Sequence, residues 1–370
     1  MAVKLNFTTP VTVYSPSTAG EDVLLTYPRI VELTHSGEHN GTLLAIGETL
    51  EVPFYKVFRS TDGGETWNYI SEVKEQLDPE LISNWQPHIY ELPCDLGDLP
   101  AGTLLASGCT RDKRVQEVTK MCVWKSCDIG ETWEEISVVD VGGRIDHGMY
   151  EPFLICDEDG TLVCFYSDET EVDDVHGQRL IFKTSKDGIN WGEKKYVLAP
   201  KERRLRPGMI TVAKADNGKY IAAYEMVAMP GHPVYVKIAD SLTDWGDPED
   251  FGLLVKSTDG KILSSTPCCE WIPYGDSADG AIIVTGWRNV DGTSKTGSDL
   301  FISLDMGKTW EALDNPLPYE FPAKHRYGYS PALLTSADKK SVFYMNSVPW
   351  EGNTQDRVRG KYVFTKLTLE

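Results

Sequence analysis

The sequence contains no long apolar run, because no stretch approaches the roughly 18 apolar residues that a membrane-spanning helix requires. Residues 1–7 also lack the apolar core and the cleavage site of a secretory signal. We therefore expect no membrane partner and a cytoplasmic location. The alternative is a secreted protein whose signal has been removed, because such a chain would have the same sequence.

Metal-binding and redox motifs are also missing. None of the 8 cysteines forms a C-x-x-C pair, and several fall inside predicted strands. His147 and His176 have no further ligands at a usable spacing. We therefore expect buried free thiols, no metal and no cofactor.

Positive charge is scarce. The chain has 36 Lys and Arg against 56 Asp and Glu, which gives a formal net charge of −20. Phosphates would be repelled by such a surface, so nucleic acid and anionic membranes are excluded as partners. The charge balance favours a neutral ligand, and the sequence leaves the oligomeric state open.

The sequence does contain a repeat of about 60 residues. Each copy has a polar residue, then a proline, then apolar residues. The prolines are 59, 65, 55, 60 and 64 residues apart, so six copies fill the 370 residues. The copies are Tyr27-Pro28-Arg29-Ile30, Gln86-Pro87-His88-Ile89, Glu151-Pro152-Phe153-Leu154, Arg206-Pro207-Gly208-Met209, Thr266-Pro267-Cys268-Cys269 and Ser330-Pro331-Ala332-Leu333.

Each unit adds further strand and turn signals. In five copies a second short apolar run follows, bounded by turn-forming residues, which is typical of a β-strand. Four units then carry a Ser-x-Asp-(x)-Gly element that ends in Trp, and a degraded copy stands at residues 240–245. This element resembles the Asp-box of sialidases and related propellers, in which Asp caps a tight turn, Gly takes a positive φ and Trp packs between strands. The four elements are residues 60–67, 126–133, 185–191 and 303–310.

Four short strands repeated six times predict an all-β, six-bladed β-propeller with Asp-box repeats, built as a single domain over residues 1–370. An N-terminal strand should pair with residues 361–365 and so cover an exposed sheet edge. The predicted blades are residues 27–80, 81–144, 145–200, 201–258, 259–320 and 321–370, the last closed by the N-terminal strand.

The repeat also predicts where function lies. Residues that flank the prolines should reach the channel of the propeller, and they are polar or carry a polar tip. Aligning the second strands places Glu48, Cys109, Ser167, Glu225 and Trp287 at one level, with Asp168 and Arg288 one step on. Glu151 and Glu225 are acids inside otherwise apolar strands of adjacent blades, and a carboxylate there is costly unless it is paired or faces a polar cavity. Two such acids are what a glycosidase needs.

Several motifs follow one another in the order found in glycoside hydrolase family 93, and the similarity is strongest over residues 85–227. The motifs are Gln86-Pro87-His88-Ile89-Tyr90-Glu91-Leu92-Pro93, Glu151-Pro152-Phe153-Leu154, Phe165-Tyr166-Ser167-Asp168, His176-Gly177-Gln178-Arg179-Leu180, Arg206-Pro207-Gly208-Met209 and Asn217-Gly218-Lys219-Tyr220-Ile221-Ala222-Ala223-Tyr224-Glu225. The resemblance implies a retaining exo-1,5-α-L-arabinanase that releases arabinobiose from linear arabinan oligosaccharides.

The same resemblance implies that Glu151 is the nucleophile, that Glu225 is the general acid/base, and that Tyr329 lies near the nucleophile. Retention implies that the two carboxyl groups stand roughly 5–5.5 Å apart. The chain departs from the family where Tyr150 replaces a Trp and Leu205 replaces an Asp, which predicts an altered subsite. The candidate substrate-binding residues are Arg29, Trp85, Gln86, His88, Tyr150, Asp168, His176, Arg206, Trp287 and Arg288.

Other functions remain open. A sialidase would share the Asp-boxes, use Tyr329 with Glu225, and need three arginines around a carboxylate, for which Arg29, Arg206 and Arg288 are candidates. The acidic chain and the first-strand Glu151 argue against that reading. A glycosidase for another sugar and a non-catalytic glycan-binding propeller are the remaining alternatives.

Overall fold

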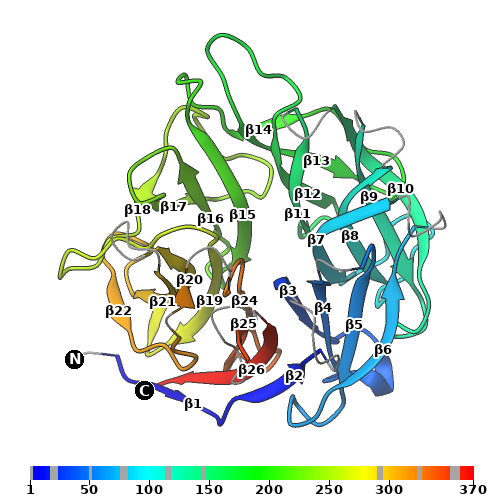
Figure 1. Cartoon of the computed structure of the whole chain (residues 1–370), viewed down its shortest axis with the longest axis horizontal. Helices are drawn as coiled ribbons and strands as arrows, with labels where there is room; N and C mark the ends of the chain where they lie inside the picture. Colours follow the sequence, from blue (N-terminus) through cyan, green and yellow to red (C-terminus); the bar gives the residue numbers. More distant parts are fainter. Residues whose placement is uncertain are drawn as a thin grey trace. The chain divides into compact units, whose positions relative to one another are not determined.

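The computed structural model describes residues 3–16, 24–49, 52–75, 82–112, 118–143, 147–289, 295–319, 321–322, 327–350 and 359–370. These residues form 26 β-strands and a single 3₁₀ turn, η1 (Gly37–His39). No helix in this part of the chain is long and apolar enough to cross a membrane. The strands form six antiparallel sheets, one for each predicted blade, which confirms the all-β, six-bladed β-propeller (Figure 1).

The chain packs as two compact units. The first unit comprises Arg29–Ile210 and Trp245–Asp250, and the second comprises Met1–Pro28, Thr211–Asp244 and Phe251–Glu370.

Three four-stranded sheets lie mainly in the first unit. Their second strands are mostly apolar because both faces are buried. In β12 (Leu162–Asp168) all seven residues are buried, and the polar ones, Ser167 and Asp168, stand at its end. The first sheet holds β3 (Leu25–Glu32), β4 (Leu43–Thr49), β5 (Tyr55–Ser60) and β6 (Asn68–Val73). The second holds β7 (Ile82–Glu91), β8 (Leu104–Asp112), β9 (Thr119–Ser126) and β10 (Glu134–Gly142). The third holds β11 (Met149–Cys156), β12 (Leu162–Asp168), β13 (Arg179–Ser185) and β14 (Lys195–Leu198).

The other three sheets lie mainly in the second unit. The fourth sheet holds β15 (Arg206–Lys214), β16 (Tyr220–Val227), β17 (Val234–Ala239) and β18 (Leu253–Leu254). The fifth holds β19 (Cys268–Tyr274), β20 (Ser277–Asn289), β21 (Lys295–Ser303) and β22 (Glu311–Leu313), and β23 (Phe321–Pro322) pairs with β21. The sixth holds β24 (Ala332–Thr335), β25 (Val342–Pro349) and β26 (Gly360–Leu369).

The N-terminal segment completes the sixth sheet, as predicted, but with two strands instead of one. Both β1 (Leu5–Phe7) and β2 (Val11–Tyr14) pair antiparallel with β26, so the blue N-terminal strands lie beside the red C-terminal strand (Figure 1). The edge of β26 is therefore covered by the other end of the chain.

The Asp-boxes form the turns that their sequence predicts. The carboxylate of Asp62 accepts the backbone N–H of Thr66 at 2.9 Å, and the hydroxyl of Ser60 accepts the N–H of Gly64 at 2.8 Å. A hydrogen bond from the Thr66 hydroxyl is the main reason why the pKa of Asp62 lies well below its usual range. The boxes differ in burial, because the ring of Trp310 is buried whereas that of Trp67 is partly exposed.

A left-handed backbone conformation recurs at the first strand of every sheet. A non-glycine residue has φ between +44° and +62° within or just before each of these strands, where such values are uncommon. In β7 and β11 the pairing register shifts at this residue, which marks a β-bulge. Proline cannot donate to the ladder, so a bulge is where a strand tolerates it. The residues are Tyr27, Gln86, Glu151, Met209, Thr266 and Ser330.

Candidate active site

Glu151 stands at the bulge of β11, and its φ is +62°. The register shift falls between Tyr150 and Phe153, so Glu151 and Pro152 are the residues that interrupt the ladder. A conformation of this kind costs about 1–3 kcal/mol and persists only where surrounding contacts hold it. The bulge therefore gives this acid a fixed direction that a regular strand would not give.

Three donors hold the carboxylate of Glu151. Its Oε2 accepts the hydroxyl of Ser167 at 2.6 Å and the backbone N–H of Met209 at 3.0 Å. Its Oε1 accepts the side-chain amide of Gln86 at 3.3 Å. Hydrogen bonds of this kind favour the ionised carboxylate, which is the form that a nucleophile requires.

Tyr150, Glu169 and Arg206 form a polar group in the same unit. The Nε of Arg206 lies 2.7 Å from Oε1 of Glu169, and the Arg206 side chain is 47% exposed. Burial, followed by the negative charge of Glu169, raises the pKa of Tyr150 well above its usual range. The structure thus gives Arg206 the partner Glu169, which the sequence did not single out.

Glu225 lies on β16 and is only 5% exposed. Its Oε2 accepts the hydroxyl of Ser265 at 2.6 Å and the backbone N–H of Thr266 at 2.8 Å. Both donors come from the segment that leads into β19, where Ser265 and Thr266 have positive φ values. The predicted buried acid is therefore held by a bend of the neighbouring first strand.

Tyr329 packs between two other aromatic rings of the second unit. Its ring centroid lies 5.6 Å from that of Tyr27 and 5.5 Å from that of Trp287, and both pairs meet edge to face. The indole N–H of Trp287 donates to the carbonyl of Tyr327 at 2.7 Å. The structure brings the predicted Tyr329 and Trp287 together and adds Tyr27.

Two predicted substrate-binding residues are buried and hold other parts of the protein. His88 accepts the backbone N–H of Leu154 at its Nδ1, 3.2 Å away, and its ring centroid lies 4.4 Å from that of Phe153. Burial, followed by the charge of Arg29, holds the pKa of His88 well below its usual range, so it is a neutral acceptor. Asp168 accepts the ammonium of Lys194 at 3.2 Å.

Three further predicted substrate-binding residues, Trp85, His176 and Arg288, lie on three different segments of the chain. Trp85 accepts the hydroxyl of Tyr55 at its carbonyl, 2.9 Å away, and Arg111 lies over its ring. His176 pairs with Asp173 at 2.9 Å, on a loop. Arg288 belongs to β20, but its side chain lies outside the described residues.

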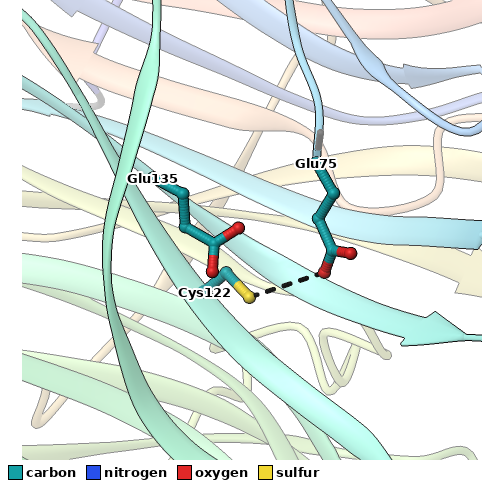
Figure 2. Close-up of side chains that lie close together, drawn as sticks. All are labelled: Glu75, Cys122 and Glu135. Atoms are coloured by element: carbon teal, nitrogen blue, oxygen red, sulfur yellow. Dashed lines mark hydrogen bonds between the residues drawn. The ribbon is translucent and has the colours of Figure 1, made fainter. Parts of the chain in front are cut away.

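One group of possible metal ligands occurs among the described residues, and it contains none of the residues that contact Glu151 above. Glu75, Cys122 and Glu135 place one ligand atom each within 4.8 Å of one another (Figure 2). The hydroxyl of Thr110 donates to Glu75, and Sγ of Cys122 lies 3.8 Å from the same carboxylate. Burial raises the pKa of the Cys122 thiol, and burial and Glu75 raise that of Glu135. The group is thus a contact among side chains that bond to one another and to Thr110.

The sequence did not reveal several residues that complete the site. Ser265 and the Met209 N–H stand on bends whose geometry depends on distant contacts. Glu169 follows Asp168 at the end of β12, in a stretch with several acids, and nothing in the sequence marks Glu169 as the one that pairs with Arg206. The available signal was the recurring proline, because Pro207 lies two residues before Met209 and Pro267 lies two residues after Ser265.

The chain is similar to solved structures of glycoside hydrolases over nearly its whole length. A family 93 α-L-arabinofuranosidase of Fusarium graminearum, in complex with arabinobiose, is 28% identical; 96% of this chain and 97% of that chain are covered, with a TM-score of 0.75. An α-L-arabinanase of Penicillium chrysogenum, also with arabinobiose, is 27% identical; 96% and 98% are covered, with a TM-score of 0.75.

A microbial sialidase described as Hadza is 14% identical, with 93% of this chain and 65% of that chain covered and a TM-score of 0.55, which shows a shared fold alone. No model of a protein family and no curated protein matches the chain. The resemblance to glycoside hydrolase family 93 predicted from the motifs is confirmed by the solved structures.

Proposed function

We infer that this chain is a glycoside hydrolase of the family 93 type, and that it acts as a retaining exo-1,5-α-L-arabinanase that releases arabinobiose from linear arabinan oligosaccharides. The observation that carries the proposal is the family-type Glu-Pro-Phe-Leu motif at Glu151, whose carboxylate is oriented by three donors. The similarity to two enzymes solved with arabinobiose supports the substrate.

The reaction takes two steps. In the first step, the ionised Glu151 attacks the anomeric carbon while Glu225 gives its proton to the leaving glycosidic oxygen, so that the C–O bond breaks and a glycosyl ester forms. In the second step, Glu225 takes a proton from water, and the water oxygen attacks the same carbon. The ester bond breaks, Glu151 leaves as a carboxylate, and the product keeps the α configuration.

The other side chains serve binding in this proposal. The pair Tyr150 and Arg206 presents a hydroxyl and a guanidinium at the exposed end of β11 and β15, where sugar hydroxyls can bond to them. Trp287 and Tyr329 offer aromatic surface against a sugar face. Tyr150 and Leu205 stand where the family usually has Trp and Asp. We therefore expect the glycan preference of this chain to differ from that of its relatives at this subsite.

The test is hydrolysis of linear 1,5-α-arabino-oligosaccharides by wild type, Glu151→Gln and Glu225→Gln, with a sialyl glycoside in parallel. Both variants should lose at least about 10³-fold in kcat. Glu91→Gln is the matched control, because Glu91 is a buried acid whose carboxylate holds the Thr34–Ser36 loop instead.

Azide separates the two roles. On an aryl arabinobioside, azide should rescue a Glu151→Ala variant by forming the glycosyl azide of inverted configuration, and rescue Glu225→Ala with retained configuration. Release of sialic acid would instead favour a sialidase with Tyr329 as nucleophile. Sugar binding without any turnover would make the chain a glycan-binding propeller.

A further inference from the structure

Gln86 contacts both the backbone and the side chain of Glu151. Its Oε1 accepts the backbone N–H of Glu151 at 3.0 Å, and its Nε2 donates to Oε1 of Glu151 at 3.3 Å. The N–H of Glu151 can only donate, so the amide oxygen must face it and the NH₂ must face the carboxylate. The sequence predicted Gln86 as a substrate-binding residue, and in the structure its side chain is hydrogen-bonded to Glu151, the proposed nucleophile.

Glu48 in turn holds Gln86. It lies on β4, is 4% exposed, and accepts the backbone N–H of Gln86 at its Oε2, 3.1 Å away. Gln86 has a φ of +62° and stands at the bulge of β7, where the pairing register with β8 shifts. A buried N–H left without a partner costs about 1–3 kcal/mol, so Glu48 stabilises the conformation that aims the Gln86 amide.

Tyr55 fixes the residue just before Gln86. Its hydroxyl donates to the carbonyl of Trp85 at 2.9 Å and to that of Cys109 at 3.2 Å. Residue 108 must be glycine for this contact, because a Cβ there would overlap the Tyr55 hydroxyl. The bulge of β7 is therefore held on both sides, by Tyr55 at Trp85 and by Glu48 at Gln86.

The second unit contains a similar contact, in which a buried glutamate accepts a backbone N–H, but there the contact does not extend to a second carboxylate. Glu225 accepts the N–H of Thr266 as Glu48 accepts that of Gln86, and both acids stand on the second strand of their sheets. The hydroxyl of Thr266, however, has no hydrogen-bond partner among the described residues. The bond from a backbone N–H to a buried glutamate therefore occurs in both units. Only Gln86, of the two residues compared, also bonds through its side chain to another carboxylate.

We propose that Glu48 and Gln86 are positioning residues for the reaction, which act in series to orient and keep ionised the carboxylate of Glu151. The proposal rests on the function inferred above. Glu48 sets the bulge, the bulge aims the amide of Gln86, and the amide fixes the backbone and Oε1 of Glu151 while Ser167 and Met209 hold Oε2.

The test compares Gln86→Met, Glu48→Met, Glu48→Gln and the double variant Glu48→Met/Gln86→Met. Gln86→Met keeps the side-chain length but removes both amide bonds, so kcat should fall about tenfold or more with KM changed less than about threefold. Glu48→Met should lower kcat in the same way, and Glu48→Gln should recover most of the loss because its amide oxygen still accepts the Gln86 N–H. The double variant should be no slower than Gln86→Met alone, because the two residues act in series.

A second readout needs no substrate. In protein labelled with ¹³C at the glutamate carboxyl carbons, the signal of Glu151 is identified as the one lost in Glu151→Gln. Its titration midpoint should move to higher pH in Gln86→Met, because the ionised form loses a donor. Glu91→Gln is the control, because it removes another buried carboxylate from β7, the strand that carries Gln86. It should leave both kcat and the Glu151 titration midpoint unchanged.

Each contrary result has a distinct meaning. A rise in KM with unchanged kcat in Gln86→Met would overturn the proposal and make Gln86 a substrate-binding residue. Additive losses in the double variant, or an unmoved Glu151 midpoint, would also overturn it. A moved midpoint in a protein that hydrolyses no arabino-oligosaccharide would support the positioning of Glu151 and overturn the arabinanase assignment instead.

Discussion

The hydroxyl of Ser167 donates a 2.6 Å hydrogen bond to Oε2 of Glu151, the same oxygen that accepts the Met209 N–H. Ser167 stands on β12, directly beside β11 in the sheet, and is fully buried. The acid is therefore held from its own sheet by a side chain and from β15 by a backbone donor. With Gln86 on β7, three strands other than β11 therefore supply the donors that orient this carboxylate.

Ser167→Ala should lower kcat about tenfold, because one donor to the ionised carboxylate is lost. The acidic limb of kcat/KM should move to higher pH, since Glu151 then binds its proton more tightly. Ser107→Ala is the matched control, because Ser107 is an equally buried serine whose hydroxyl has no hydrogen-bond partner among the described residues. An unshifted acidic limb in Ser167→Ala would show that this bond does not tune Glu151.

Tyr329→Phe should keep the melting temperature but lower kcat, because the edge-to-face contacts with Tyr27 and Trp287 need only the ring. Tyr329→Leu should lose both ring contacts, at about 0.5–1.5 kcal/mol each, and so reduce stability as well. Thermal unfolding and kcat measured on the same preparations separate the two effects. Full activity in Tyr329→Phe would leave the residue with a packing role alone.

The Trp residues of two Asp-boxes should differ in their effect on stability. Trp310 is 1% exposed, and its indole N–H donates to the carbonyl of Gly307 at 3.0 Å. Trp310→Ala should therefore cost about 3–5 kcal/mol in free energy of unfolding. Trp67→Ala should cost clearly less, because its ring is partly exposed although its N–H makes the equivalent bond to Gly64 at 3.2 Å. Equal losses in urea unfolding would contradict this ranking.

Glu270 should make stability depend on pH. Burial raises the pKa of this carboxyl to about 7. The folded state therefore binds a proton that the unfolded state has released, so this contribution is full below about pH 4.5 and is lost as pH rises through about 7. Glu270→Gln should remove that dependence and gain up to about 3 kcal/mol at pH 8 relative to wild type. Melting temperatures from pH 5 to 8 measure it, and parallel curves for the two proteins would refute the prediction.

Much of the fold could be predicted because its information is local. The recurring proline, the short apolar runs and the Asp-box residues each report a strand or a turn within about ten residues, so the number of sheets follows from the repeat. The pairing of β23 with β21 does not, because it joins residues of two different predicted blades. Glu151 and Glu225 could be chosen as candidates for the same reason, since an acid in an apolar strand is visible in the sequence itself. The family motifs around them predict the reaction.

The six repeated units, the turns and the choice of Glu151 and Glu225 as candidates follow from local patterns in the sequence. The side chains that meet these two acids depend on how strands distant in the sequence come together. Gln86 lies 65 residues before Glu151. Its amide reaches the acid because both residues have a left-handed backbone conformation and stand at the bulges of β7 and β11. Arg206 likewise pairs with Glu169, and His88 turns into the core to accept a backbone N–H. Periodicity reports burial and local turns, whereas these partnerships depend on the register between strands, which the bulges shift.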